Sequence, residues 1–139
     1  MKKYLNLSLI YAFAAMICGV FYREITKWNG YTEVTTLGKA HAHLFVMGTI
    51  VFLIVALFSA YQELEKIKMF RVFLWVYNIG LPITTLMMVV RGITQILKIS
   101  LSDAGNAAIS GIAGIGHILT GVGIILLLVS LKKTAGNGR

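Results

Sequence analysis

The chain has 139 residues, of which 58% are hydrophobic and 13% are charged, with a single proline. This composition is too apolar for a soluble domain of this size, and the apolar residues lie in long blocks rather than in amphipathic stripes. The net charge of +8 would suit a nucleic-acid-binding protein, but the basic residues are spread along the chain and form no single patch. We therefore expect an integral membrane protein whose surroundings are lipid, and no nucleic acid partner.

Four apolar blocks are long enough to cross a bilayer, which takes about 20 residues of helix. Only helices satisfy their own backbone hydrogen bonds in lipid without closing a barrel. We therefore expect an all-α integral membrane protein with four transmembrane helices in a single domain, residues 1–139. The expected helices are residues 5–22, 37–61, 72–97 and 109–131; the expected loops are residues 23–36, 62–71 and 100–106, and residues 134–139 are expected to form a flexible tail.

Lysine and arginine residues flank the four blocks unevenly. Eight lie on the side shared by the two termini and the middle loop, against five on the other side. Because positive charge accumulates on the cytoplasmic side, this bias predicts that both termini are cytoplasmic. The expected location is the bacterial cytoplasmic (inner) membrane, with the chain crossing it several times.

The second block opens on Ala40-His41-Ala42-His43, in a chain with three histidines. Residues two apart on an α-helix are rotated by about 200°, so His41 and His43 are expected to point to nearly opposite faces. One small metal ion is not easily held by both from an undistorted helix, and the pair suits two separate sites. Lys39 lies four residues before His43, on the same face and nearer the membrane surface.

The third and fourth blocks add further polar features. Pro82 follows Asn78 by four residues and deprives its carbonyl of a partner, so we expect a kink that neighbouring helices satisfy. In the fourth block His117 is flanked by Gly114 and Gly121, which leaves its face bare one turn above and below. That space suits a flat ring or, alternatively, a closely packed helix. At 1.5 Å per residue, His41 and His117 lie roughly 6 Å and 12 Å into their blocks, in the outer half of the membrane.

Histidine inside a membrane helix is costly and is functional by default. Haem suits these residues, because its iron takes axial imidazoles from flanking helices while the apolar macrocycle fills the space between them. No Cys-x-x-Cys-His is present for covalent attachment, so the expected cofactor is haem b. Lys39, Arg23 and Arg91 lie at a level where they could pair with haem propionates; the two arginines could equally be interfacial anchors.

Residues 39–52, KAHAHLFVMGTIVF, resemble the histidine-bearing helices in the catalytic subunit of haem-copper oxidases and nitric oxide reductases. In that family a His-x-His on one helix serves two haems, and the subunit consists of three four-helix units around a pseudo-threefold axis. The resemblance implies that this chain is similar to one such unit. It further implies a homotrimer in which His41 of one subunit and His43 of the next ligate the same haem. The chain is also similar to an uncharacterised family of short four-helix bacterial membrane proteins.

The chain departs from the oxidases in having no adjacent His-His pair to build a copper centre, so catalysis by an oxidoreductase stays an open question. The predicted function is a membrane protein with histidine-ligated haem b, for electron transfer or for binding a diatomic gas. The alternative is a non-haem transporter or assembly module in which the histidines bind copper or relay protons. The role of His117 is open between a second metal site, a hydrogen-bond donor to the haem pocket and the axial partner of His41 or His43. No electron donor or acceptor is indicated by the sequence.

Overall fold

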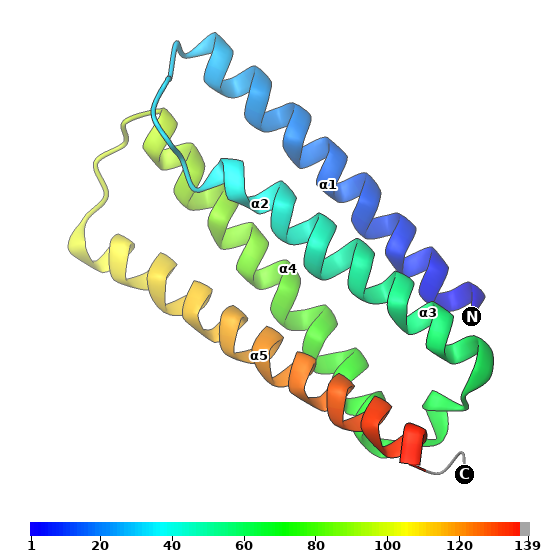
Figure 1. Ribbon diagram of the computed structural model, residues 1–139. Helices are drawn as coiled ribbons and strands as arrows, with labels where there is room; N and C mark the ends of the chain where they lie inside the picture. Colours follow the sequence, from blue (N-terminus) through cyan, green and yellow to red (C-terminus); the bar gives the residue numbers. More distant parts are fainter. Residues whose placement is uncertain (137–139) are drawn as a thin grey trace.

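The computed structural model describes residues 1–136, which form helices and their connections without a β-strand (Figure 1). The elements are α1 (Lys2–Trp28), α2 (Leu37–His43), the π-helix η1 (Leu44–Ile50), α3 (Val51–Tyr61), the short 3-10 turn η2 (Leu64–Lys66), α4 (Lys68–Ile96) and α5 (Asp103–Gly136). Because α2, η1 and α3 are continuous, residues 1–136 contain four helical stretches that are long and apolar enough to cross a membrane. The prediction of an all-α protein with four candidate membrane spans is confirmed.

The predicted loops were too long. Residues 23–28 continue α1, which ends at Asn29 and at Gly30, whose φ of 58° favours glycine. The loop predicted at 62–71 shrinks to 62–67, and the loop predicted at 100–106 shifts to 97–102, because α4 ends at Ile96 and α5 begins at Asp103. Residues 134–136 of the predicted tail belong to α5, while 137–139 lie outside the described residues. A helix does not stop where its side chains become polar, since its backbone bonds continue until a residue interrupts them.

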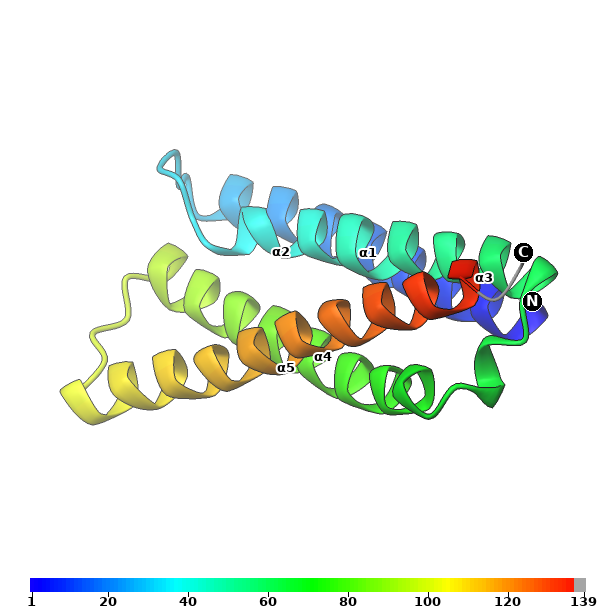
Figure 2. The same ribbon diagram turned by 60° about the horizontal axis from the view of Figure 1, so that its bottom comes forward.

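The four crossings lie in chain order in Figure 1, with α1 and α5 at opposite edges, and in Figure 2 α5 lies across α4. The second crossing packs on α1 along its length, α2 also packs on α4, and α5 packs extensively on α4. The N-terminus, η2 and the end of α5 lie at one end of the molecule (Figure 1). We call this the terminal end, and we call the end with residues 29–36 and 97–102 the distal end.

An aromatic core fills the terminal half of the protein. Phe52 of α3 is fully buried at its centre, with ring centroids 5.5 Å from Tyr11, 6.1 Å from Phe73 and 6.0 Å from Tyr77. Rings of this size bury a large apolar area, and centroid separations in this range are favourable for aromatic pairs. The core joins α1, α3 and α4, so the rotation of α3 about its axis is fixed by packing.

Two polar side chains of α4 inside the candidate membrane span are hydrogen-bonded, whereas the buried hydroxyl of Thr84 has no partner. The Asn78 amide donates a hydrogen bond to the carbonyl of Leu74 at 2.8 Å, and its oxygen accepts one from the Tyr11 hydroxyl at 3.0 Å. The helix continues through Pro82, and Thr85 Oγ1 donates to the Leu81 carbonyl nearby at 2.9 Å. The Tyr11–Asn78 bond joins α1 to α4, and the other two bonds lie within α4.

The N-terminus is docked on η2 by a carboxylate, which makes this contact pH-dependent. The hydrogen bond that Tyr4 donates to Glu65 at 2.6 Å, together with Lys3 at 3.6 Å, holds the pKa of Glu65 below its usual value of about 4.3. A lowered folded-state pKa contributes stability above the unfolded pKa, and that stability is lost as the pH falls through the folded pKa. We expect this contribution to thermal stability in detergent to be constant from pH 7 to about pH 5 and to be lost, by a small amount, below about pH 4.3. Glu65→Gln should reduce this loss; an unchanged pH dependence would contradict the assignment.

Candidate functional site

The histidines of the second crossing point to different neighbours. The Cβ and Cγ atoms of His41 lie 3.8 Å from the position that a Cβ would take on Gly19 of α1. The ring of His43 instead lies edge-on beside the ring of His117 on α5, with centroids 6.4 Å apart and planes at 84°. The expected opposite orientation of His41 and His43 is therefore confirmed, and His117 lies beside His43 within one chain.

Backbone carbonyls hold His43 and His117 in the same tautomer. The Nδ1 atom of His43 lies 3.0 Å from the carbonyl oxygen of Lys39, and that of His117 lies 2.8 Å from the carbonyl oxygen of Ala113. A carbonyl only accepts, so each Nδ1 carries the proton and donates it. In a neutral ring Nε2 then has a free lone pair, which is the arrangement that backbone carbonyls impose on metal-binding histidines.

His41 differs from the other two histidines. Its Nδ1 atom is buried and has no hydrogen-bond partner. If Nε2 were to bind a metal, Nδ1 would carry a buried proton with no acceptor, which is unfavourable. Within one chain, His41 is therefore the least suitable of the three predicted ligands.

The separation of the two facing rings fits a shared metal. Two imidazoles that bind one ion through nitrogen at about 2 Å have ring centroids roughly 5 to 6.5 Å apart, with the larger value for ligands on opposite sides of the ion. The observed 6.4 Å lies at that upper end. Within the described residues, no group of three or more His, Cys, Asp or Glu side chains is close enough to hold an ion. The candidate site within one chain thus consists of two imidazoles.

Two glycines of α5 are packed on α4, and two others near His117 are open. A Cβ on Gly116 would lie 2.6 Å from Thr84 Oγ1, and one on Gly123 would lie 2.8 Å from the Tyr77 ring, so these two let α5 approach α4. A Cβ on Gly114 or Gly121 would meet nothing within 4 Å. The bare face predicted around His117 therefore exists, and packing inside this chain does not fill it.

This division predicts opposite responses to the same substitution. Gly116→Ala places a methyl group against the Thr84 backbone as well as its side chain, and overpacking of this kind costs about 1–3 kcal/mol. Gly114→Ala adds a methyl group in open space and gains helix propensity, so the fold should be at least as stable. Thermal unfolding of both variants in the same detergent checks the prediction, and equal destabilisation would contradict it.

A cavity of about 240 Å³ lies beside His117 between α4 and α5. Its lining includes Met87, Met88, Arg91 and Ser110. The Arg91 guanidinium donates to the Asn106 side chain at 2.7 Å, to the Asn106 carbonyl at 3.3 Å and to Ser110 Oγ at 2.8 Å. These acceptors are all neutral, so Arg91 keeps its full charge near the N-terminus of α5 and at the edge of the histidine pair. An anionic group would be stabilised here.

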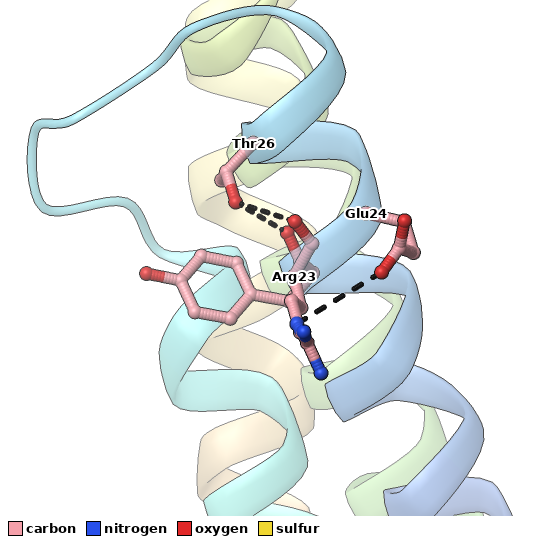
Figure 3. Close-up of polar contacts among 4 residues, drawn as sticks. Arg23, Glu24 and Thr26 are labelled. Carbon is pink, nitrogen blue, oxygen red and sulfur yellow. Dashed lines mark hydrogen bonds and ion pairs between the residues drawn. The ribbon is translucent and has the colours of Figure 1, made fainter.

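The other two predicted basic residues do not join this cavity. Arg23 is on α1, and α1 and α5 lie at opposite edges of the molecule in Figure 1. Its side chain is 80% exposed, and its Nε atom lies 3.9 Å from the Glu24 carboxylate (Figure 3). Beside it, Thr26 donates a hydrogen bond to the Arg23 carbonyl at 3.0 Å (Figure 3). Lys39 is exposed, and its contact with His43 is through its backbone carbonyl. The structure therefore brings together His43, His117 and Arg91.

Sequence reasoning missed two residues of the site. Asn106 and Ser110 fix the Arg91 guanidinium, but polar residues at the start of a helix are common and indicate no particular contact. The pairing of His117 with His43 was one of the alternatives left open by the sequence, and their similar depth in the membrane was its one signal.

Four candidate membrane spans are the features of a multi-pass α-helical membrane protein. The chain belongs to the family described as protein of unknown function (DUF2871), whose sequence profile matches residues 1–134. No curated protein and no solved structure matches the chain.

Proposed function

We propose that this protein binds haem b in the membrane, with His43 and His117 of one chain as axial ligands, and serves electron transfer or the binding of a diatomic gas. The observation that carries the proposal is the facing pair of rings 6.4 Å apart, each with Nδ1 bonded to a carbonyl and Nε2 left free. Bound haem would supply a reversible one-electron centre, or an open iron position for a gas if one histidine dissociates.

Three features of the surroundings support haem over a smaller ligand. The face around His117 is bare at Gly114 and Gly121, which leaves space for a flat ring. The adjoining cavity is lined by Met87 and Met88, which suits an apolar macrocycle. Arg91 offers a positive charge without a carboxylate partner, which suits a propionate.

One chain encloses only part of the proposed haem site, and this supports an oligomer. The cavity of about 240 Å³ is smaller than the roughly 300–1,000 Å³ typical of enclosed ligand sites. A second copy packed over the ring bound at the Gly114 face would complete the enclosure, and closed rings are a common way to arrange such contacts. We therefore retain the homotrimer suggested by the resemblance to the haem-copper oxidases, and change its ligand assignment from His41 of a neighbouring subunit to His117 of the same chain. We also propose the bacterial inner membrane, with the terminal end cytoplasmic.

Absorption spectroscopy tests the proposal directly. Protein expressed with ample haem and purified in detergent should show a Soret band that shifts on reduction with dithionite, with one haem per chain. A colourless preparation that also fails to take up added haem would overturn the proposal.

Copper is the second candidate, because two facing imidazoles near methionine side chains also suit Cu(I). Met87 and Met88 line the cavity that contains His117, and thioether sulfur is a soft ligand. A preparation that is colourless but holds one copper ion per chain, lost in His43→Ala and His117→Ala, would favour this transport or assembly role over haem.

A further inference from the structure

The second crossing changes its winding directly after the histidines. Helix α2 ends at His43, and the next seven residues, Leu44–Ile50, form the π-helix η1 before α3 resumes the α-helical pattern. A π-helix bonds each carbonyl to the N–H five residues on, so it accommodates an extra residue. One residue corresponds to about 100° of rotation, so η1 determines how α2 is rotated relative to α3.

Side chains from both neighbouring helices bind the backbone of η1. Ser8 of α1 donates a hydrogen bond to the Thr49 carbonyl at 2.8 Å, and Tyr77 of α4 donates one to the Met47 carbonyl at 2.7 Å. Both donors are buried, at 6% and 0% exposure. A carbonyl that leaves the regular helical ladder in lipid needs another donor, because no water is available there.

Close packing on α1 holds the same segment. A Cβ on Gly48 would lie 2.5 Å from Cγ of Tyr11, so only glycine fits against that ring. The Tyr11 hydroxyl in turn donates to Asn78 of α4 at 3.0 Å. The π-helix is therefore in contact with α1 and α4 on two sides, while α3 beyond it is fixed in the aromatic core by Phe52.

We propose that Ser8 and Tyr77 are positioning residues: by holding the π-helix through the carbonyls of Thr49 and Met47, they set the rotation of α2 that points His43 at His117. They touch neither histidine, and they act through the backbone. The functional meaning of this device rests on the proposed function, in which His43 and His117 are the ligands, but the geometry can be measured without a cofactor.

Thiol cross-linking measures the geometry. In a Cys18→Ser background, His43→Cys and His117→Cys together should react with one short bismaleimide within a chain, seen as a single added reagent by intact-protein mass spectrometry. Adding Ser8→Ala and Tyr77→Phe should lower the yield by about tenfold, the scale expected for losing one or two buried hydrogen bonds. Ser8→Thr, which keeps a hydroxyl, should restore part of the yield.

Matched controls separate positioning from general destabilisation. Ser130→Ala and Tyr4→Phe remove the same chemical groups from buried hydrogen bonds elsewhere, to the Leu126 carbonyl and to Glu65, and should leave cross-linking unchanged. Deletion of the exposed Val46 removes one residue from η1 and should abolish cross-linking while far-ultraviolet circular dichroism keeps its helical signal. An unchanged yield in both the double variant and the deletion would overturn the inference.

The absorption spectrum of the haem-loaded protein provides an independent measurement. With all three histidines present, Ser8→Ala with Tyr77→Phe should convert the six-coordinate spectrum to a five-coordinate one without removing the haem. If the wild-type protein binds no haem but the cross-linking results hold, the proposed function fails and the positioning inference stands. If haem binds and the double variant leaves both spectrum and cross-linking unchanged, the inference fails and the proposed function stands.

Discussion

Replacing His43 or His117 with alanine is expected to lower haem affinity by at least about 10–100-fold, the loss seen when even an outer partner of a metal ligand is removed. Residual haem should be five-coordinate, with a shifted Soret band. The same substitution at His41 should leave both the affinity and the spectrum close to wild type. The reason is the hydrogen bonding of the rings, since His43 and His117 donate from Nδ1 to carbonyls while the buried Nδ1 of His41 has no acceptor.

Haem titration of the three purified variants, followed by absorption of the oxidised and reduced forms, distinguishes the arrangements. Circular dichroism and gel filtration in detergent should show that all three retain helix content and oligomeric state. If His41→Ala removes haem and His117→Ala does not, the ligands come from His41 of one subunit and His43 of another. That result would contradict the pairing within one chain and restore the ring suggested by the resemblance to the oxidases.

The four crossings could be predicted from sequence because each apolar block is long enough on its own to demand a helix in lipid. Their ends could not, because they depend on local backbone geometry at residues such as Gly30, and polarity does not mark it. The π-helix was also beyond prediction. It depends on hydroxyl groups of Ser8 and Tyr77, which reach it from α1 and α4 only after those helices have packed.

For the site, helical periodicity was enough to predict that His41 and His43 face opposite ways, because only local backbone rotation is involved. Sequence could not predict which neighbour each would meet, since that depends on the order in which the crossings pack. The glycines of α5 illustrate the same limit. Gly114 and Gly121 are seven residues apart, as are Gly116 and Gly123, yet only the second pair packs on α4.

Filling the open face is expected to exclude the cofactor while leaving the fold intact. Gly114→Leu and Gly121→Leu each place a branched side chain within one helical turn of His117, where a Cβ meets nothing in this chain. Both should lower haem occupancy by tenfold or more, because the added side chain takes the space proposed for the macrocycle. The free energy of unfolding without haem should change by less than about 0.5 kcal/mol, or rise with the better helix propensity of leucine.

Gly111→Leu is the matched control, because a Cβ at this position also meets nothing within 4 Å. Gly111 lies six residues before His117, and it is therefore rotated about the helix axis by about 120° from the His117 face. The Gly111→Leu variant should retain haem. Loss of haem in the Gly114 and Gly121 variants alone would then assign the open face to the cofactor.

The competing use of a bare glycine face is close packing of another helix. If Gly114→Leu dissociates the oligomer but the separated chains keep their haem, the face is a subunit contact and the macrocycle lies elsewhere. Haem content and molar mass measured on the same gel-filtration peak decide between the two, because a ligand site and a helix contact respond differently to the same side chain.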